Sequence, residues 1–348
     1  MPLSSILDVP ESRRTAIARL AKEFVPGRHV VVTTHMNADG DACGSVAAAA
    51  RLLAAQGLVP RIVNPTPWPA AFDFLLDEGV TNATGRGASA IMPLDLLLVL
   101  DVSDVKRLGN LASTVRTLKV PRLVVDHHVR TDEPAGDIIL ADTTACATGE
   151  LLFDLAVTLG WEITTPIATA LYTAILTDTG GFRFSNTSPR CHAVAAALLA
   201  AGVDPEAMYR RIYASVSLGR LHLLRDALDT LEVDADAGIA WIALPAEALD
   251  RHDVSAEDLD GIVEHPRSIA GTRLALFFRD LGHGKVKVSF RSTGDIDVNV
   301  FARRFGGGGH ARAAGALLAG TLDNVRRTVV DAAREFVAQP ASASGPEA

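Results

Sequence analysis

The chain has 348 residues, which is enough for two domains that each bury a core of their own. Hydrophobic residues make up 48% of it and charged residues 21%, as is typical of globular proteins. Its 41 acidic side chains outnumber its 33 basic ones, and the formal charge of −8 argues against a broad electrostatic contact with long nucleic acid. Any phosphate ligand must therefore be held locally, by a bound cation and a few arginines.

The cysteine pattern and the N-terminal sequence predict a cellular location. Cys43, Cys146 and Cys191 have no spacing typical of a metal or redox pair, and their odd number does not suggest a disulfide framework, so a reducing cytoplasm fits. The first residues lack a basic region followed by an apolar segment, and no apolar run approaches the roughly 18 residues of a membrane span. We therefore expect a cytoplasmic protein without membrane contact.

A β-branched run near the N-terminus, Val30–Val32, predicts a strand buried in a parallel sheet. In the sequence HMNADGDACGS that follows, His35, Asp39 and Asp41 fall within seven residues, and Gly40 lets the backbone turn so that both carboxylates face one point. A helical pattern comes next, so these side chains lie in a strand-to-helix crevice, where open α/β sheets bind ligands. One imidazole and two carboxylates suit Mn²⁺ or Mg²⁺, although an ordinary turn that caps the helix is the alternative.

Two further buried strand patterns end in polar side chains. Asp95–Leu100 contains the run LLLVL and is followed by Asp101, and Leu123–Val125 leads through an aspartate to His127 and His128. Two adjacent histidines after a buried strand are hard to explain as packing, because a core would have to satisfy both polar rings.

A carboxylate also stands at the end of a predicted helix. Helical patterns over Cys146–Leu159 and Pro166–Leu176 alternate with the strands, which indicates a parallel, doubly wound sheet. The second pattern runs into Asp178 and a glycine pair, a helix stop at which the helix dipole disfavours a carboxylate. A bound cation would offset that effect, although a plain exposed aspartate is equally compatible with the pattern.

The C-terminal part contains a glycine run within FGGGGHARAAG. Four consecutive glycines, among them Gly308 and Gly309, precede His310, and we expect the alanine-rich segment after it to begin a helix whose N-terminus favours anions. The nearby Arg291 favours anion binding over the alternative of a flexible hinge. Before this segment, strands are predicted over Ile239–Leu244, Arg273–Phe278 and Lys285–Arg291.

These patterns predict an α/β protein with an N-terminal, doubly wound, mainly parallel sheet and a smaller C-terminal α/β domain. Residues 204–231 look like one long charged helical stretch, and we place a helical linker there. The expected parts are a catalytic domain over 12–203, the linker over 204–232, a substrate-binding domain over 233–338 and a disordered tail over 339–348.

Five motifs together carry a resemblance to a known family. HMNADGDACGS, LDVSD, DHH, DTGGF and GGGGHARAAG occur in the order found in DHH phosphoesterases that carry a DHH-associated C-terminal domain (DHHA1), in the branch of nanoRNases that also act as pAp phosphatases. The resemblance covers nearly all of residues 12–338. The family usually has proline where this chain has Ala38, a change that alters loop stiffness but removes no ligand.

The resemblance implies specific roles for single residues. It implies that Asp101 bridges two metal ions and is itself catalytic, and that His128 contacts the scissile phosphate or assists proton transfer. One ion would be held by His35, Asp39 and Asp101, and the other by Asp41, Asp101, His127 and Asp178. Substrate would be bound by Arg291, Gly308, Gly309 and His310.

The same resemblance implies an activity and partners. The expected enzyme is a phosphodiesterase and phosphatase with two Mn²⁺ per active site, Mg²⁺ or Co²⁺ being the alternatives. Its expected substrates are short RNA oligonucleotides up to about five nucleotides, linear dinucleotides such as pApA and pGpG, pAp and cyclic di-AMP, but not long duplex nucleic acid. A homodimer is expected. The alternatives are a manganese-dependent inorganic pyrophosphatase-like enzyme, a larger DHH-type single-strand exonuclease, and an inactive nucleotide sensor.

Overall fold

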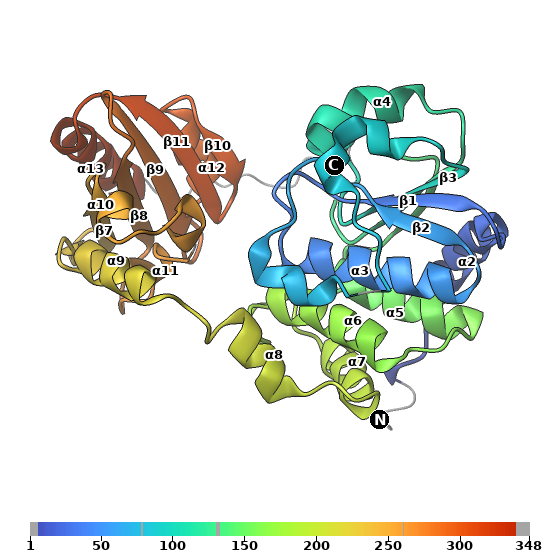
Figure 1. The fold of residues 1–348 in the computed structure, drawn as a ribbon. Coiled ribbons are helices and arrows are strands. Elements are labelled where there is room, and N and C mark those ends of the chain that lie inside the picture. Colours follow the sequence, from blue (N-terminus) through green and yellow to red (C-terminus); the bar gives the residue numbers. More distant parts are fainter. Residues whose placement is uncertain (1–5, 78, 130–132, 260, 339–348) are drawn as a thin grey trace, which may run out of the picture. The chain divides into compact units, whose positions relative to one another are not determined.

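The computed structural model describes residues 6–77, 79–129, 133–259 and 261–338, and of His310 only the backbone. The tail predicted to be disordered, 339–348, lies outside these residues. The chain divides into two compact units, Met1–Ser215 and Val216–Ala348, each with its own sheet (Figure 1). The boundary falls inside the segment predicted as a linker.

The predicted doubly wound parallel sheet is confirmed in the first unit. Its five strands lie in the order β2-β1-β3-β4-β5, and every neighbouring pair is parallel. The chain moves from β1 outward to β2 and then returns to β3 on the other side of β1, so the winding reverses between β1 and β3. The carboxyl ends of these two strands therefore flank the crevice in which such sheets bind ligands. The strands are β1 (His29–Thr33), β2 (Val59–Ile62), β3 (Leu96–Leu100), β4 (Arg122–Asp126) and β5 (Ile138–Ala141).

Alternate residues of these strands pack into two different cores. Val30 and Leu98 face the side covered by the long helices, whereas Val31 and Val99 face the side covered by α4 and two 3₁₀ helices. The helices are α2 (Glu11–Leu20), α3 (Gly40–Ala55), α4 (Ala112–Thr117), α5 (Thr148–Leu159), α6 (Thr165–Asp178), α7 (Pro189–Ala200) and α8 (Pro205–Ile212), and the 3₁₀ segments are Ala21–Glu23, Ala70–Leu75, Thr84–Ile91 and Val105–Leu111.

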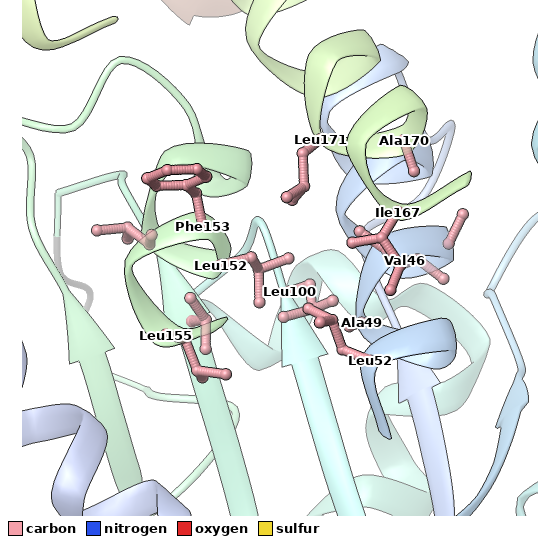
Figure 2. Close-up of a cluster of buried hydrophobic side chains, with 14 of the residues drawn as sticks. Val46, Ala49, Leu52, Leu100, Leu152, Phe153, Leu155, Ile167, Ala170 and Leu171 are labelled. Atoms are coloured by element: carbon pink, nitrogen blue, oxygen red, sulfur yellow. The ribbon is translucent and has the colours of Figure 1, made fainter. Parts of the chain in front are cut away.

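Small residues let α3, α5 and α6 approach one another closely. Figure 2 shows side chains of α3, α5 and α6 gathered around Leu100 at the end of β3. Gly44 of α3 lies against the backbone of α6, so that a Cβ there would be 2.4 Å from the carbonyl oxygen of Ala170. A Cβ at Gly149 of α5 would be 2.6 Å from the Cβ of Ala174. The first turns of α3 and α5 are thereby held near the carboxyl ends of the strands.

The second unit has a six-stranded sheet in the order β10-β11-β9-β8-β7-β6, in which only β7 and β8 are parallel. The three strands predicted here are confirmed as β7 (Ile239–Leu244), β8 (Leu274–Asp280) and β9 (Lys285–Ser292). The other elements are α9 (Leu218–Leu228), β6 (Glu232–Asp234), α10 (Ala248–Arg251), the 3₁₀ segment Ala256–Leu259, α11 (Glu264–Arg267), α12 (Val298–Arg303), β10 (Gly308–His310), β11 (Ala313–Ala319) and α13 (Leu322–Ala338).

Two expectations about helices were wrong. The alanine-rich segment after His310 is strand β11, which pairs with β9 along its whole length and buries Ala314 and Ala316. Residues 204–231 form two helices, because Ser217 accepts a hydrogen bond from the backbone N–H of Arg220 and begins α9 anew. In the described part of the chain, every helix is too short or too polar to cross a membrane.

The close contact at Gly44 predicts that this position does not tolerate a side chain. We expect Gly44→Ala to lower the free energy of unfolding by about 1–3 kcal/mol, because backbone atoms of α6 must move to admit the methyl group. Gly85→Ala is the matched control, since a Cβ at this exposed glycine meets nothing within 4 Å. Chemical denaturation of both variants measures the difference, and equal stabilities would contradict the packing argument.

Candidate active site

Polar side chains from four segments meet at the carboxyl ends of β1, β3 and β4. His35, Asp39 and Asp41 follow β1, Asp101 follows β3, His127 and His128 follow β4, and Asp178 is the last residue of α6. Their donor atoms form three groups, each within 4.8 Å, that could hold a metal ion. The groups are His35, Asp39 and Asp101; Asp41, His127 and Asp178; and Asp101, His127 and His128.

Asp41 is a buried carboxylate held by the first turn of another helix. Its Oδ2 accepts a hydrogen bond from the backbone N–H of Thr148 at 2.7 Å, and its Oδ1 accepts one from that of Gly149 at 3.1 Å. Ser45 donates its hydroxyl to Oδ1 at 3.0 Å. Burial and the negative charges of Asp101, Asp178 and Asp39 nevertheless raise the pKa of Asp41 well above its usual range. The site thus holds more negative charge than its own side chains neutralise.

His127 carries a buried nitrogen that is unsatisfied within the described structure. Its Nε2 has no hydrogen-bond partner there and lies 3.6 Å from oxygens of Asp41 and Asp101 and 3.7 Å from one of Asp178. A buried polar atom without a partner costs free energy, and native structures rarely contain one. A divalent cation between this nitrogen and the three oxygens would satisfy all of them, so the donor set fits a metal ion.

His35 supports the same interpretation on the other side of Asp101. Its Nδ1 lies 2.8 Å from the carbonyl oxygen of Met36, which requires an N–H at Nδ1. Its Nε2 then faces Oδ2 of Asp101 at 3.3 Å and Oδ2 of Asp39 at 4.0 Å. Either a proton or a cation must lie between such atoms. Burial lowers the pKa of His35, but the contacts with Asp101 and Met36 outweigh it and raise the pKa.

His128 is held differently from His127. Its Nδ1 lies 2.8 Å from Oδ1 of Asp126, which also accepts the backbone N–H of His128 at 3.1 Å. The hydrogen bond with Asp126 raises the pKa of His128 and leaves Nε2 as its other nitrogen. Burial raises the pKa of Asp126, but the hydrogen bonds from His128 and Ser103 outweigh it and lower the pKa. His128 is therefore a fixed, half-exposed imidazole suited to hold a proton.

Asp178 lies at the C-terminus of α6, as predicted. Burial raises its pKa to about 6, while His127 opposes the shift and Asp101 adds to it. Its Oδ2 accepts a hydrogen bond from Nδ2 of Asn186 at 3.1 Å, and the same amide nitrogen donates to the carbonyl oxygen of Cys146 at 2.8 Å. Asn186 thus fixes Asp178 relative to the segment that leads into α5.

Sequence reasoning missed the groups that support this cluster. Arg13 of α2 is buried and contacts Asp142, Glu150 and Asp154 at 2.7–2.8 Å. Glu150 in turn accepts the backbone N–H of Cys146 at 3.0 Å, which fixes the start of α5 and hence the two N–H groups that hold Asp41. The partners lie 129 to 141 residues from Arg13 in the sequence, and no local pattern connects them.

In the second unit, Arg291 and the glycine run lie at the same end of three neighbouring strands, β9, β11 and β10. Cross-strand pairing aligns Arg291 with Ala313, and Ala313 with the backbone of His310. Arg291 lies at a pocket of about 220 Å³ that also contains Arg279, Lys287 and Ser289. Its Nε is 3.3 Å from Oε1 of Glu264.

The glycines serve close strand packing rather than an open anion cradle. The N–H groups of Gly306 and Gly307 donate to backbone carbonyls of α12, and that of Gly309 donates to Oδ1 of Asn299. A Cβ at Gly307 would lie 2.1 Å from the carbonyl oxygen of Gly315. The expected helix N-terminus is replaced here by a hairpin of β10 and β11.

Family models match both units of the chain. The DHH family N-terminal domain matches residues 29–175, and the DHHA1 domain matches residues 239–339. The chain belongs to the DHH phosphoesterase family. Among its relatives, the bifunctional oligoribonuclease and PAP phosphatase NrnA of Thermus thermophilus is 32% identical to this DHH protein, covering 94% of this chain and 97% of the relative. The protein of that name from Bacillus subtilis is 28% identical, covering 82% and 88%.

Solved structures show the same fold. The crystal structure of an exopolyphosphatase-related protein from Bacteroides fragilis has a TM-score of 0.86 and 27% identity, covering 93% of this DHH chain and 97% of that chain. A manganese-bound exonuclease RecJ has a TM-score of 0.51 and 17% identity, covering 96% of this chain and 97% of that chain, which supports the fold alone.

Arg13 predicts a large effect on stability. Arg13→Met removes the guanidinium that pairs with three carboxylates, two of which keep a contact with Arg190, and we expect it to lower the free energy of unfolding by about 3–5 kcal/mol. Arg14→Met is the control, because Arg14 is exposed and pairs with Glu11, an interaction worth about 1 kcal/mol or less. Denaturant titration measures the free energy of unfolding of both variants. Similar losses would show that the buried ion pairs of Arg13 do not contribute the expected stability.

Asp101→Asn tests the carboxylate cluster. The backbone at Asp101 has φ +60°, which asparagine tolerates better than alanine. Without metal we expect a higher melting temperature than in the wild type, because one negative charge is removed and the new amide can donate to Nε2 of His35. Added Mn²⁺ should raise the melting temperature of the wild type but not of the variant, and thermal shift measurements check both effects.

Asp137→Asn is the control for that experiment. Asp137 is exposed, pairs with Arg122 at the opposite end of β4, and bears a charge of the same sign. It should retain the metal-dependent shift in full. A metal-dependent shift of wild-type size in Asp101→Asn would contradict a role for Asp101 in metal binding.

Proposed function

We propose that this chain is a metal-dependent phosphodiesterase and phosphatase that hydrolyses short linear oligonucleotides to mononucleotides and removes a phosphate from pAp to leave AMP. The observation that carries the proposal is the orphaned Nε2 of His127 among three carboxylates, in a chain whose relatives are named oligoribonuclease and PAP phosphatase. Cyclic di-AMP is a further proposed substrate.

The proposed metal ligands divide into two sets that share Asp101. His35, Asp39 and Asp101 would hold one ion, and Asp41, Asp101, His127 and Asp178 the other. The first set is one of the three donor groups, and three members of the second set, Asp41, His127 and Asp178, form another. When bound, two divalent cations such as Mn²⁺ polarise the phosphoryl group and lower the pKa of a bound water toward neutrality.

His128 would act on the substrate rather than on a metal. Because Asp126 holds Nδ1, Nε2 is the nitrogen that can face a substrate phosphate. The raised pKa of His128 favours its cationic form, which can hold a proton against the charge that develops on phosphoryl oxygens. Asp126 thereby serves to orient and charge His128.

Nucleotide binding is assigned to the second unit, to Arg291, Gly308, Gly309 and His310. The basic side chains of Arg279, Lys287 and Arg291 around one pocket support a site for an anion there. Since the N–H groups of Gly306, Gly307 and Gly309 are already used, we propose that basic side chains such as Arg291 bind the phosphate, and that Gly308 and Gly309 let the nucleotide approach the backbone closely. A homodimer and a cytoplasmic location remain predictions, which sedimentation and cell fractionation would check.

The substrate range tests the proposal. With Mn²⁺ present, we expect hydrolysis of pAp, pApA, pGpG and RNA up to about five nucleotides, and a rate at least tenfold lower on RNA of about thirty nucleotides, because the net charge of −8 disfavours long polyanions. Cyclic di-AMP and inorganic pyrophosphate belong in the same assay, with products resolved by chromatography.

Asp101→Asn distinguishes the activity of this protein from that of a contaminating enzyme. Its rate on pAp should fall at least about 100-fold, the usual cost of removing one electrostatic group from an active site. Equal cleavage of long RNA and dinucleotides would contradict the preference for short substrates. Hydrolysis of pyrophosphate without hydrolysis of nucleotides would favour the pyrophosphatase alternative.

A further inference from the structure

The turn after α6, which follows the site carboxylate Asp178, displays an exposed aromatic ring. Phe184 is 51% exposed, and its ring edge lies directly on Gly180, where a Cβ would be 2.4 Å from the ring. Gly180 is the second residue after Asp178. An exposed apolar side chain alone means little, because folded proteins expose many of them. What distinguishes Phe184 is how the turn is built.

Three consecutive residues of this turn have left-handed backbone conformations. Gly180 has φ +57°, Gly181 +70° and Phe182 +64°. For a phenylalanine this conformation is unfavourable and persists only where the surroundings impose it. Phe182 then packs inward, with its ring 5.2 Å from that of His192 and 6.1 Å from that of Tyr172, and Phe184 is directed outward.

The turn is also tied rigidly to the site. Asn186 donates to the carboxylate of Asp178 at 3.1 Å, two residues after Phe184. Arg183 donates its Nε to the carbonyl oxygen of Gly180 at 2.6 Å, which leaves an exposed guanidinium on the same turn as the exposed ring. An aromatic face and a cation next to metal-ligand candidates are the groups that recognise a base and a phosphate.

We propose that Phe184 is a platform on which a nucleobase of the substrate stacks, with Arg183 beside it for a phosphate. This inference rests on the proposed function and deepens it, because it makes the base a recognised part of the substrate. A nucleotide with its phosphate at the carboxylates carries its base one sugar away, and the turn that presents Phe184 begins directly after Asp178. An exposed aromatic face accepts any base, so stacking gives affinity without strict sequence preference.

Equilibrium binding of two ligands tests the platform. AMP carries a base and ribose 5-phosphate does not, and both are titrated calorimetrically into the full chain with Mn²⁺. We expect wild-type protein to bind AMP more tightly than ribose 5-phosphate. Phe184→Ala should weaken AMP binding about tenfold and leave ribose 5-phosphate unchanged, since a base stacked on an aromatic ring contributes roughly that factor or more.

Three further variants separate stacking from general effects. Phe184→Trp should restore AMP binding, and Phe184→Leu should not, because leucine keeps an apolar surface but has no aromatic face. Val157→Ala is the matched control, an exposed apolar residue near the opposite end of α5 from the site. Melting temperatures of all variants should stay close to that of the wild type.

Each remaining outcome is decisive. Equal wild-type affinities for AMP and ribose 5-phosphate, an unchanged affinity for AMP in Phe184→Ala, or an equal loss for both ligands would overturn the platform. Turnover of pAp by the wild type is measured separately. If the wild type does not turn over pAp, the proposed function is contradicted. The binding of AMP and ribose 5-phosphate still tests whether Phe184 stacks on a base.

Discussion

A buried negative charge at Asp41 is the constraint around which the first unit is built. Its oxygens accept two backbone N–H groups from the first turn of α5 and one hydroxyl from α3, so two helices begin at the same carboxylate. The positive end of the α5 dipole stabilises this charge. Because Asp101 and Asp178 add further negative charge nearby, the helix ends offset only part of the cost, and a bound cation would offset the remainder.

The packing of the helices follows from that constraint. The first turns of α3 and α5 can meet at Asp41 only if the two helices and α6 lie close together, and glycines at positions 44 and 149 permit this contact. Arg13 and Glu150 then fix the start of α5 from the other side, through the N–H group of Cys146. A substitution at Arg13 or Glu150 would therefore change the site indirectly, by shifting the start of α5 and the N–H groups that hold Asp41.

The sequence allowed the ligand candidates to be predicted, because each follows a buried strand or ends a helix. A carboxylate at the end of a parallel strand has few places to point, so strand patterns alone were enough to assign Asp101 and His127 to the crevice. The support of the site could not be predicted, since the contacts of Arg13 and Asn186 join residues that are far apart or lie in irregular turns. Local patterns contain no information about such partners.

The segment after the glycine run shows a second limit of predicting structure from local sequence. Alanines are compatible with helix, and local composition favoured one, but pairing with β9 makes the segment a strand. The glycines permit a second pairing, that of β11 with β10: at Gly307 and Gly309 the backbone of β11 comes so close that a Cβ would overlap it. The helix propensity of the alanines did not determine the conformation of this segment; its pairing with neighbouring strands did.

Backbone strain among the described residues of the first unit is concentrated in the segments that carry the site. Asn37, Asp101 and Phe182 have positive φ angles of 56°, 60° and 64°, and each lies in a loop that presents ligand candidates. Such conformations cost of order 1–3 kcal/mol each and persist only where other contacts impose them. The contacts that do so are hydrogen bonds: Thr66 accepts the N–H of Asn37, Val125 accepts that of Asp101, and Thr179 accepts that of Phe182. Contacts with Thr66, with β4 and with Thr179 thus hold three loops away from their preferred conformations, and these are the segments that carry the ligand candidates and the exposed ring.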